Sequence, residues 1–427
     1  MISVYKYGEI DKKEVFSRMS PVTDVSDAVS EIIREVRENG DSALYKFCEK
    51  FDGAKLDSLE VSEEEFEEAM KSTEPEFLRI LQKAAGNIRL FHEKQKRNGY
   101  IVNADPGCLL GQRVIPIEKV GLYVPGGTAA YPSTVLMDAI PAKIAGCSQI
   151  VMVTPPGKNG KIAPQILAAA RVAGVDRVFK IGGAQAIAAL AYGSESVLKV
   201  DKIVGPGNAY VAEAKKQVFG QVSIDMIAGP SEILVVADAD SSPVNIVADL
   251  LSQAEHDRLA SAVLVCNSER LAQEVKSELE RQIPLLERSE IARASIDTNG
   301  KIIITDSIDT AIDIANELAP EHLELCVDNP FDYLDKVKNA GSVFMGRNCP
   351  EALGDYYAGP NHTLPTGGTA RFSSPLSVDD FVKKSQFIYY TGEAFKAAGR
   401  DVDFFARKEG LTAHARSVNV RLEEKGK

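Results

Sequence analysis

The spacing of hydrophobic residues changes near residue 114 and divides the chain into two kinds of predicted structure. Before this point, apolar residues recur at helical intervals, most clearly between residues 74 and 96. Ser62, followed three residues later by Glu65, has the pattern of a capping box that begins a helix. The first hundred residues are therefore predicted to be mainly helical.

From about residue 114 onward, short runs rich in valine and isoleucine alternate with helical segments. Strands are predicted at 150–153, 177–181, 202–204, 233–236, 262–265, 302–304, 323–327 and 342–345. Helices are predicted between them at 164–173, 184–192 and 209–218, from 243 onward, and at 271–280 and 311–318. This alternation is typical of parallel sheets with helical crossovers. The predicted fold class is α/β, with two Rossmann-like parallel-sheet units, a helical N-terminal region and a small helical C-terminal tail.

Two boundaries are predicted between these units, near Gly121 and Gly229. The segment 347–380 is polar and rich in glycine, proline and serine, so it is predicted to be a long loop. Loops of this length in compact domains usually carry function.

Composition excludes some classes of protein. The formal net charge of -12 argues against a nucleic-acid partner, because binding phosphates needs clustered lysine and arginine. The N-terminus lacks the pattern of a signal peptide, and no apolar run reaches membrane-spanning length. Six scattered cysteines without a C-x-x-C pair fit reduced thiols, so a cytoplasmic location is expected.

Glycine turns follow several of the predicted strands. They are Gly126-Gly127, Gly182-Gly183-Ala184-Gln185 and Gly205-Pro206-Gly207-Asn208. Neither G-x-G-x-x-G nor the P-loop pattern occurs in the chain. These turns fit ordinary strand-to-helix connections, and they equally fit a cofactor crevice at the carboxyl ends of parallel strands.

Four of the five histidines lie in short polar motifs: His256, His322, His362 and His414. The fifth, His92, lies in a charged run and is predicted to be an ordinary surface residue. Imidazole binds first-row metals and moves protons near neutral pH. This distribution predicts one site assembled from distant segments.

A metal-binding set can be drawn from these motifs. Gln253 and His256 are three residues apart and share one helix face. Asp355 and His414 complete a set of two nitrogens and two oxygens, which suits zinc. The glutamine oxygen is a weak ligand, which favours a site open to substrate over a structural zinc. His256 alone would be explained by the helix dipole.

Glu321 and His322 form an adjacent acid/base pair where a helix has ended and a strand begins. One reading is a capping carboxylate beside a packed histidine. The other is a pair in which one group activates water and the other moves protons. Position at the start of a strand does not decide between them.

The motifs, taken in order, resemble the histidinol dehydrogenase family over nearly the whole chain. They are Gly121-Leu122-Tyr123-Val124-Pro125-Gly126-Gly127, Gly182-Gly183-Ala184-Gln185-Ala186, Gly205-Pro206-Gly207-Asn208, Gly229-Pro230-Ser231-Glu232, Gln253-Ala254-Glu255-His256, Pro320-Glu321-His322, Gly354-Asp355 through Asn361-His362, and Glu409-Gly410-Leu411-Thr412-Ala413-His414. The resemblance implies an enzyme that depends on zinc and NAD. It implies oxidation of L-histidinol to L-histidine through L-histidinal with two NAD, the last step of histidine biosynthesis. It also implies a homodimer in which the tail of one subunit completes the site of the other.

The resemblance also implies roles for particular residues. The zinc ligands would be Gln253, His256, Asp355 and His414, and the NAD contacts Tyr123, Gln185 and Asn208. The substrate contacts would be Ser231, His322, Asp355 and Glu409, together with the zinc ligands. Glu409 and His414 would come from the partner subunit. His322 is the candidate base for the alcohol and Glu321 activates water, while His362 supports proton transfer or positions its loop.

These assignments imply a division into domains. Residues 1–20 form an N-terminal segment, and 21–120 plus 230–375 form a first α/β domain with the metal site. Residues 121–229 form a second α/β domain that contacts NAD. Residues 376–427 form the tail in the dimer interface.

Four alternatives remain at this stage. A relative could oxidise another metal-chelating alcohol, although Ser231 and Glu409 favour histidinol. A zinc hydrolase could use Glu321 as its base, but it would not need two glycine-turned units. A binding protein without activity would not retain Glu321-His322. An aldehyde dehydrogenase thiolate could come from Cys108 or Cys147, for which a structural role is predicted.

Overall fold

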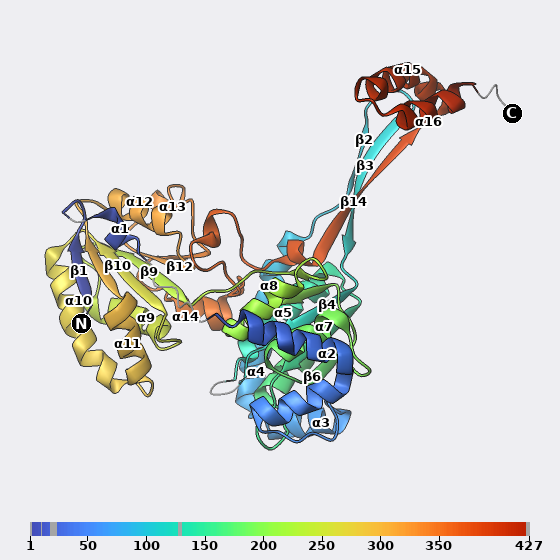
Figure 1. The fold of residues 1–427 in the computed structure, drawn as a ribbon. Helices are drawn as coiled ribbons and strands as arrows, with labels where there is room; N and C mark the ends of the chain where they lie inside the picture. Colours follow the sequence, from blue (N-terminus) through green and yellow to red (C-terminus); the bar gives the residue numbers. More distant parts are fainter. Residues whose placement is uncertain (1, 10, 18–23, 127–129, 424–427) are drawn as a thin grey trace. The chain divides into compact units, whose positions relative to one another are not determined.

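The computed structural model describes residues 2–9, 11–17, 24–126 and 130–423 (Figure 1). The chain divides into two compact units. The larger comprises residues 1–95 and 117–381, and the smaller comprises 96–116 and 382–427. Gly127 of the Gly126-Gly127 turn, and residues 1, 10 and 18–20 of the predicted N-terminal segment, lie outside the described residues.

The larger unit contains a five-stranded parallel sheet in the order β6-β5-β4-β7-β8. Its strands are β4 (Lys119–Tyr123), β5 (Gln149–Thr154), β6 (Arg177–Lys180), β7 (Lys202–Val204) and β8 (Ser223–Ile224). The crossover helices are α5 (Pro132–Ala145), α6 (Pro164–Ala173), α7 (Gly183–Tyr192) and α8 (Ala209–Val218).

The same unit contains a six-stranded parallel sheet in the order β1-β11-β10-β9-β12-β13. Its strands are β1 (Ser3–Lys6), β9 (Glu232–Ala237), β10 (Ser261–Cys266), β11 (Lys301–Ile304), β12 (His322–Cys326) and β13 (Ser342–Met345). The helices that accompany it are α1 (Lys12–Val15), α9 (Pro243–Ala254), α10 (Glu269–Gln282), η3 (Ile283–Leu285), α11 (Ser289–Asn299), α12 (Ile308–Leu318) and α13 (Phe331–Leu334).

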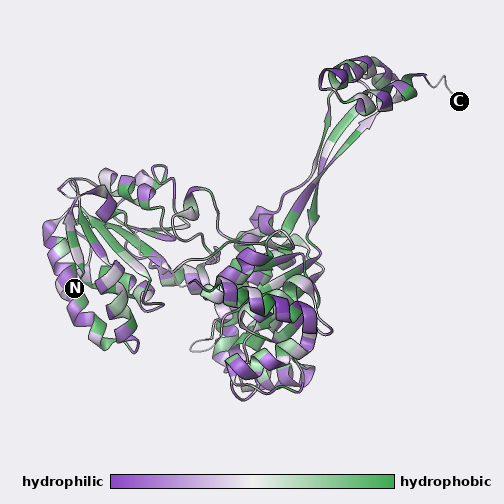
Figure 2. Ribbon diagram, viewed as in Figure 1, coloured by the Kyte–Doolittle hydropathy of each residue, from purple (hydrophilic) through white to green (hydrophobic). Residues whose placement is uncertain are grey.

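Both parallel sheets therefore have the predicted α/β architecture and share one topology. In each sheet a central strand, β4 or β9, is followed along the chain by two strands that add outward on one side of it. The following strand, β7 or β12, then pairs with the other side of the central strand. The central strands are buried on both faces, as expected for parallel sheets with helices on each side. Figure 2 shows these strands as largely hydrophobic, whereas the helices carry hydrophilic stretches along their length.

The N-terminal helices pack on the five-stranded sheet. They are α2 (Ser26–Phe47), α3 (Glu63–Ser72) and α4 (Pro75–His92), with short turns η1 (Cys48–Asp52) and η2 (Glu93–Gln95). Val29 and Leu44 of α2 share a buried cluster with α7, and Leu81 and Ile88 of α4 share one with α5. This packing differs from the predicted grouping of 21–120 with 230–375. Helical periodicity showed which face is buried but not which sheet it covers.

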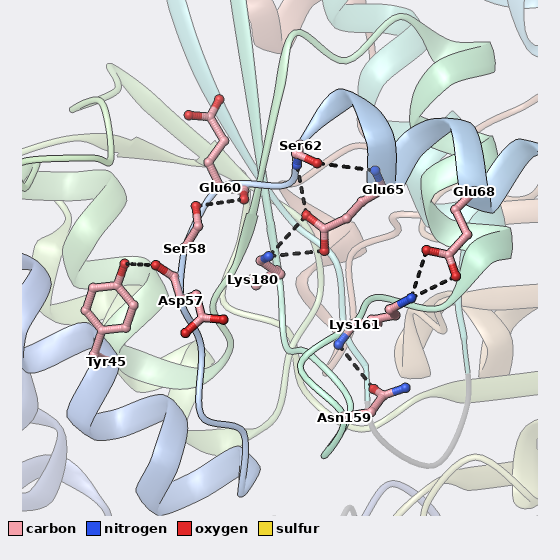
Figure 3. Close-up of polar contacts among 10 residues, drawn as sticks. All are labelled: Tyr45, Asp57, Ser58, Glu60, Ser62, Glu65, Glu68, Asn159, Lys161 and Lys180. Carbon is pink, nitrogen blue, oxygen red and sulfur yellow. Dashed lines mark hydrogen bonds and ion pairs between the residues drawn. The ribbon is translucent and has the colours of Figure 1, made fainter.

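The predicted capping box is confirmed at the start of α3. Glu65 N donates to Ser62 Oγ (3.3 Å), and Ser62 N donates to Glu65 Oε2 (2.9 Å; Figure 3). The Glu65 carboxylate also pairs with Lys180 Nζ at 3.1 Å, at the end of β6. Glu65 therefore both caps its own helix and ties that helix to the sheet.

His92 is not the surface residue that the sequence predicted. Its side chain is fully buried at the end of α4, and its Nδ1 lies 2.7 Å from Gln95 Oε1. Burial lowers its pKa. His92 follows Ile88 by four residues and so lies on the same buried face, whereas the neighbouring charged residues had suggested exposure.

The smaller unit contains a three-stranded antiparallel sheet in the order β14-β3-β2. Its strands are β2 (Tyr100–Asn103), β3 (Cys108–Pro116) and β14 (Val382–Tyr390), and helices α15 (Gly392–Lys408) and α16 (Thr412–Glu423) follow. The helical tail is confirmed, but β14 was missed. Most of its side chains are exposed, so it lacks the hydrophobic alternation that marks a strand. The prediction of a mainly helical first hundred residues also missed β1 and β2, which are only four residues long.

The segment 347–380 is largely irregular, as predicted. It contains only short turns: α14 (Glu351–Leu353), η4 (Gly354–Ala358), η5 (Thr369–Arg371) and η6 (Val378–Phe381), the last ending one residue beyond the segment. In the described part of the chain, no helix combines the length and apolar character needed to cross a bilayer.

Candidate active site and cofactor-binding edge

The acid/base pair lies where two neighbouring strands of the six-stranded sheet begin. His322 opens β12 and pairs in register with Ile233 of β9. Glu232 N donates to Glu321 Oε2 at 2.9 Å, and His322 Nδ1 lies 3.0 Å from the Glu232 carbonyl oxygen. A carbonyl only accepts, so Nδ1 carries hydrogen. His322 Nε2 is left as the nitrogen that can exchange a proton.

The segment after β13 brings a carboxylate and a second imidazole to this pair. Asp355, in the π-helical turn η4, has its Oδ1 at 3.7 Å from His322 Nε2 and 3.9 Å from His362 Nδ1. His362 Nε2 lies 3.3 Å from Thr134 Oγ1, at the start of α5. Four of the predicted residues, Glu321, His322, Asp355 and His362, are therefore brought together.

Burial and charge set the protonation of this group. Burial raises the pKa of Glu321 to about 8, although the neighbouring His322 opposes the shift. Burial alone would lower the pKa of His322, but Glu321 and Asp355 outweigh it and raise that pKa to about 10. Burial lowers the pKa of His362, and His322 holds the pKa of Asp355 below its usual value against the effect of burial.

Gln253 is the clearest candidate ligand on α9. Its side chain is 1% exposed, and its Oε1 has no hydrogen-bond partner among the described residues. An orphaned buried oxygen is costly unless something else binds it. His256 follows just beyond the helix, with its backbone N donating to the Gln253 carbonyl at 3.1 Å. Reduced hydration lowers the pKa of His256, against the attraction of Asp355, and so favours its neutral form.

A group of side chains that overlaps the predicted set only in part could also hold a metal ion. His322, Glu351 and Asp355 each offer a ligand atom, all within 4.8 Å of one another. Only Asp355 belongs to the predicted set. Glu351 was missed, because a lone acidic residue after Pro350 carries no signal of its own. Its carboxylate is buried and accepts from Ser252 Oγ at 2.9 Å, one residue before Gln253.

Three further predicted residues are not among those brought together here. Ser231 directly precedes β9, and its carbonyl accepts from Ser261 N at 3.0 Å. Glu409 and His414 belong to the smaller unit, where both are exposed. Their contribution to the site stays a prediction.

The predicted NAD contacts all lie at the carboxyl edge of the five-stranded sheet. Tyr123 ends β4, and its hydroxyl accepts from Gly183 N at 3.1 Å. Gln185 is buried in the first turn of α7. Asn208 caps α8, accepting from Tyr210 N and Val211 N at 3.0 and 3.2 Å. Ligands of open α/β sheets bind where the strand order reverses, which here is between β4 and β7.

The two cysteines considered as nucleophiles are both buried. Cys147 Sγ lies 3.7 Å from the Phe381 carbonyl oxygen, and burial raises its pKa to about 11. A thiol in this state is a poor nucleophile at neutral pH. Cys108 lies in the smaller unit, at the start of β3.

Three features of the structure together define a class of protein. They are two parallel sheets of nucleotide-binding topology, glycine turns at the carboxyl ends of the strands of one sheet, and a buried acid/base pair beside oxygen and nitrogen donors. They are typical of dinucleotide-dependent oxidoreductases.

Comparison with known proteins identifies the family. Residues 17–422 match the histidinol dehydrogenase family model. The chain is 58% identical to the histidinol dehydrogenase of Bacillus cereus (strain ATCC 10987 / NRS 248) over 93% of this chain and 92% of that protein. It is 51% identical to that of Clostridium acetobutylicum over 99% of each. The crystal structure of histidinol dehydrogenase from Elizabethkingia anophelis matches with a TM-score of 0.94, 40% identity, and coverage of 99% and 98%. The chain belongs to the histidinol dehydrogenase family, whose members are NAD-dependent oxidoreductases of histidine biosynthesis.

Proposed function

We propose that this chain oxidises L-histidinol to L-histidine through L-histidinal, using two NAD and a zinc ion. The observation that carries the proposal is the convergence of Glu321, His322 and Asp355 on one point, in a chain of this family. The two steps together consume one water and two NAD, and release two NADH with protons.

The residues present fit a divalent metal. Gln253 Oε1 is buried without a partner, Asp355 favours its anionic form, and His256 favours its neutral form. These are the states in which such side chains bind zinc. Gln253, His256 and Asp355 would hold the ion, with His414 of a partner subunit as fourth ligand. When bound, zinc would orient and polarise the chelating alcohol.

His322 is proposed to take the alcohol proton. Its Nδ1 hydrogen faces the Glu232 carbonyl, which fixes the ring and directs Nε2 toward the side occupied by Asp355. The high pKa of His322 results from the neighbouring carboxylates. A cation beside Asp355 would offset the negative charge of these carboxylates and so lower the pKa of His322 toward neutral pH. His362, fixed against Thr134, is proposed to support the same proton transfer or to position the loop.

Glu321 is proposed to activate the water that adds to the aldehyde. Its Oε2 is held by Glu232 N, and Oε2 lies 3.8 Å from His322 Nδ1. A carboxyl group with a pKa of about 8 can both accept and return a proton near neutral pH. Hydride acceptance is the chemistry that NAD would supply, from the edge formed by Tyr123, Gln185 and Asn208.

A homodimer with shared sites is the proposed assembly, and the smaller unit supports it. That unit exposes large apolar side chains on both its sheet and its helices. They include Tyr100, Ile101, Ile388, Tyr389, Phe404 and Phe405. A surface of this kind is typical of protein contacts. Mixing subunits that carry His414→Ala with subunits that carry His256→Ala should restore activity if the sites are shared; inactive mixtures of folded dimers would contradict sharing.

The test of the proposed function is NADH formation from L-histidinol and NAD, before and after chelation. Two NADH per histidinol, lost on chelation and restored by zinc, are expected. If metal-loaded wild-type protein forms no NADH from histidinol, the proposed substrate is wrong, and other metal-chelating alcohols become the next candidates.

A further inference from the structure

Three ionisable side chains are buried beneath the glycine turn that follows β7, and the proposed chemistry uses none of them. Asp138 of α5 is completely buried. The Lys215 and Asp225 side chains are 2% and 1% exposed and form an ion pair. Burying charged groups is unfavourable unless they are paired and hydrogen-bonded. The hydrogen bonds that these side chains make to the backbone indicate the role of the ion pair.

The Lys215–Asp225 pair holds both backbone groups of Gly205. Gly205 N donates to Asp225 Oδ2 at 2.8 Å, and the Gly205 carbonyl accepts from Lys215 Nζ at 3.0 Å. Gly205 has a φ of +111°, and an added Cβ would lie 2.1 Å from the Tyr123 carbonyl oxygen. The turn is thus fixed beside the end of β4, where Tyr123 is proposed to contact NAD.

Asp138 lies between this turn and the segment that carries His362. Thr363 Oγ1 donates to Asp138 Oδ1 at 3.0 Å. Asp138 Oδ2 has no hydrogen-bond partner among the described residues, and it packs against Gly205 so closely that a Cβ added there would lie 3.1 Å from it. Asn361 Nδ2 donates to the Met137 carbonyl at 2.6 Å, and Thr363 N donates to Asn361 Oδ1 at 2.8 Å. The residues on either side of His362 are therefore anchored to α5.

The protonation of Asp138 makes the cluster electrically balanced. Burial, with a further contribution from the negative charge of Asp225, raises the pKa of Asp138 to about 8. A neutral Asp138 leaves one cation facing one anion. Lys215 and Asp225 can then hold Gly205 through their hydrogen bonds, and Asp138 adds no third buried charge.

We propose that Lys215, Asp225 and Asp138 are positioning residues that fix the Gly205 turn and the His362 segment relative to each other. The inference rests on the proposed use of that turn for NAD. Hydride transfer requires the cofactor and the proton-transfer group to be placed together, so a shared anchor for both would favour the reactive geometry. The competing explanation is a buried ion pair with a role in stability alone.

The first test removes the pair as a unit. Lys215→Met alone would leave Asp225 as a buried unpaired charge and is expected to fold poorly, so it is combined with Asp225→Asn. The matched control is Lys202→Met with Asp380→Asn, which removes another ion pair of the larger unit (3.3 Å), with side chains 7% and 30% exposed, that starts from the same strand β7. Melting temperature and zinc content are measured for both double variants.

The decisive measurement is the dissociation constant for NADH, obtained by fluorescence titration. We expect it to rise at least about tenfold for the Lys215/Asp225 double variant and little for the control, with zinc content unchanged in both. A folded Lys215/Asp225 variant with wild-type NADH affinity would overturn the inference. If wild-type protein binds NADH but does not oxidise histidinol, the proposed substrate fails while this comparison still stands. If wild-type protein does not bind NADH, both proposals fail.

The second test addresses the link through Thr363. Thr363→Val removes the hydroxyl that donates to Asp138, and Thr363→Ser retains it. We expect the valine variant to lower kcat several-fold with KM for NAD nearly unchanged, and the serine variant to recover it. Equal kcat for wild type and a folded valine variant would show that the His362 segment does not depend on Asp138.

Discussion

The two parallel sheets share one strand order but place their polar groups at opposite edges. In the five-stranded sheet, Tyr123 and the Gly205 turn lie at the carboxyl ends of β4 and β7, where the order reverses. In the six-stranded sheet, Glu321 and His322 lie at the amino ends of β9 and β12. Topology alone therefore does not determine where chemistry is placed.

The carboxyl edge of the six-stranded sheet is occupied by its own side chains. Arg347 donates to both oxygens of Asp238 at 2.5 and 2.7 Å and also pairs with Asp328. Ser241 Oγ donates to the Cys326 carbonyl at 2.6 Å. These contacts satisfy polar groups at the position where a ligand would bind in a sheet of this topology.

Side-chain caps also differ between the helices, although α8 of the five-stranded sheet is capped by Asn208 and α11 of the six-stranded sheet has no side-chain cap. In the six-stranded sheet, α9, α10 and α12 are capped by Ser242, Ser268 and Ser307. In the five-stranded sheet, α5, α6 and α7 begin without a side-chain cap. Uncapped N-termini leave backbone N–H groups available to anions such as a pyrophosphate. The different placement of polar groups supports the proposal that NAD binds at the five-stranded sheet and that proton transfer takes place at the six-stranded sheet.

The largest effect is expected at the amino edge of the six-stranded sheet. Glu321→Gln keeps the shape of the side chain but removes the base, so oxidation of histidinal should slow by about 10²–10⁴-fold. Zinc content should stay at the wild-type level, because Glu321 is not a proposed ligand. The control is Glu290→Gln, an exposed residue of α11. Loss of zinc in the Glu321 variant would instead place this residue in the metal site.

At the other sheet, Gly205→Ala should weaken NADH binding by about tenfold or more, because the new Cβ would displace the turn. Gly220→Ala is a matched control, since Gly220 also has a positive φ (+97°) but no neighbouring atom within 4 Å of an added Cβ. Both variants should lose stability from backbone strain, and only the first should lose affinity. Equal NADH dissociation constants would show that the turn does not contact the cofactor.

Arg347→Met tests whether the carboxyl edge of the six-stranded sheet is only structural. The free energy of unfolding should fall by about 1.5–3 kcal/mol, because charged hydrogen bonds to Asp238 are lost. The measurement is denaturant unfolding, combined with NADH titration. A change in NADH affinity would indicate that NAD binds this sheet as well, and the contrast between the sheets would fail.

The smallest effect concerns the helix caps. Ser307→Ala removes the hydroxyl that accepts from Thr310 N at 3.1 Å, and it should cost about 1 kcal/mol of stability. Catalytic constants should not change. Altered KM values in this variant would connect α12 to the site in a way that its capping role does not explain.

Buried strands with strong hydrophobic runs could be predicted closely from sequence. β7 and α8 begin and end at the predicted residues, because burial on both faces leaves a continuous apolar run or a regular helical stripe. β14 could not be predicted, since its exposed strand depends on pairing with a segment far back in the chain. The sheet on which α2 and α4 pack could not be predicted either, because the helical spacing of apolar residues shows which face is buried but not which sheet it packs against.

The candidate site shows a similar division. Glu321, His322, Asp355 and His362 were identified from their motifs, and the structure brings them together. Glu351 and the Asp138–Lys215–Asp225 cluster carry no local pattern, because their significance comes from burial and from partners distant in sequence. The roles of Glu409 and His414 still depend on the proposed homodimer, in which the tail of one subunit completes the site of the other.

The pairing of β3 with β14 has a consequence for folding during synthesis. Pro116 pairs with Val382, so roughly 270 residues must leave the ribosome before β3 meets this partner, or about 15–50 s at common synthesis rates. Until then, β3 has only the short β2 beside it and presents an unpaired edge, which is a template for association with other chains. Nascent chains that share a polysome would therefore be most prone to mispairing at this strand, before the larger unit is complete.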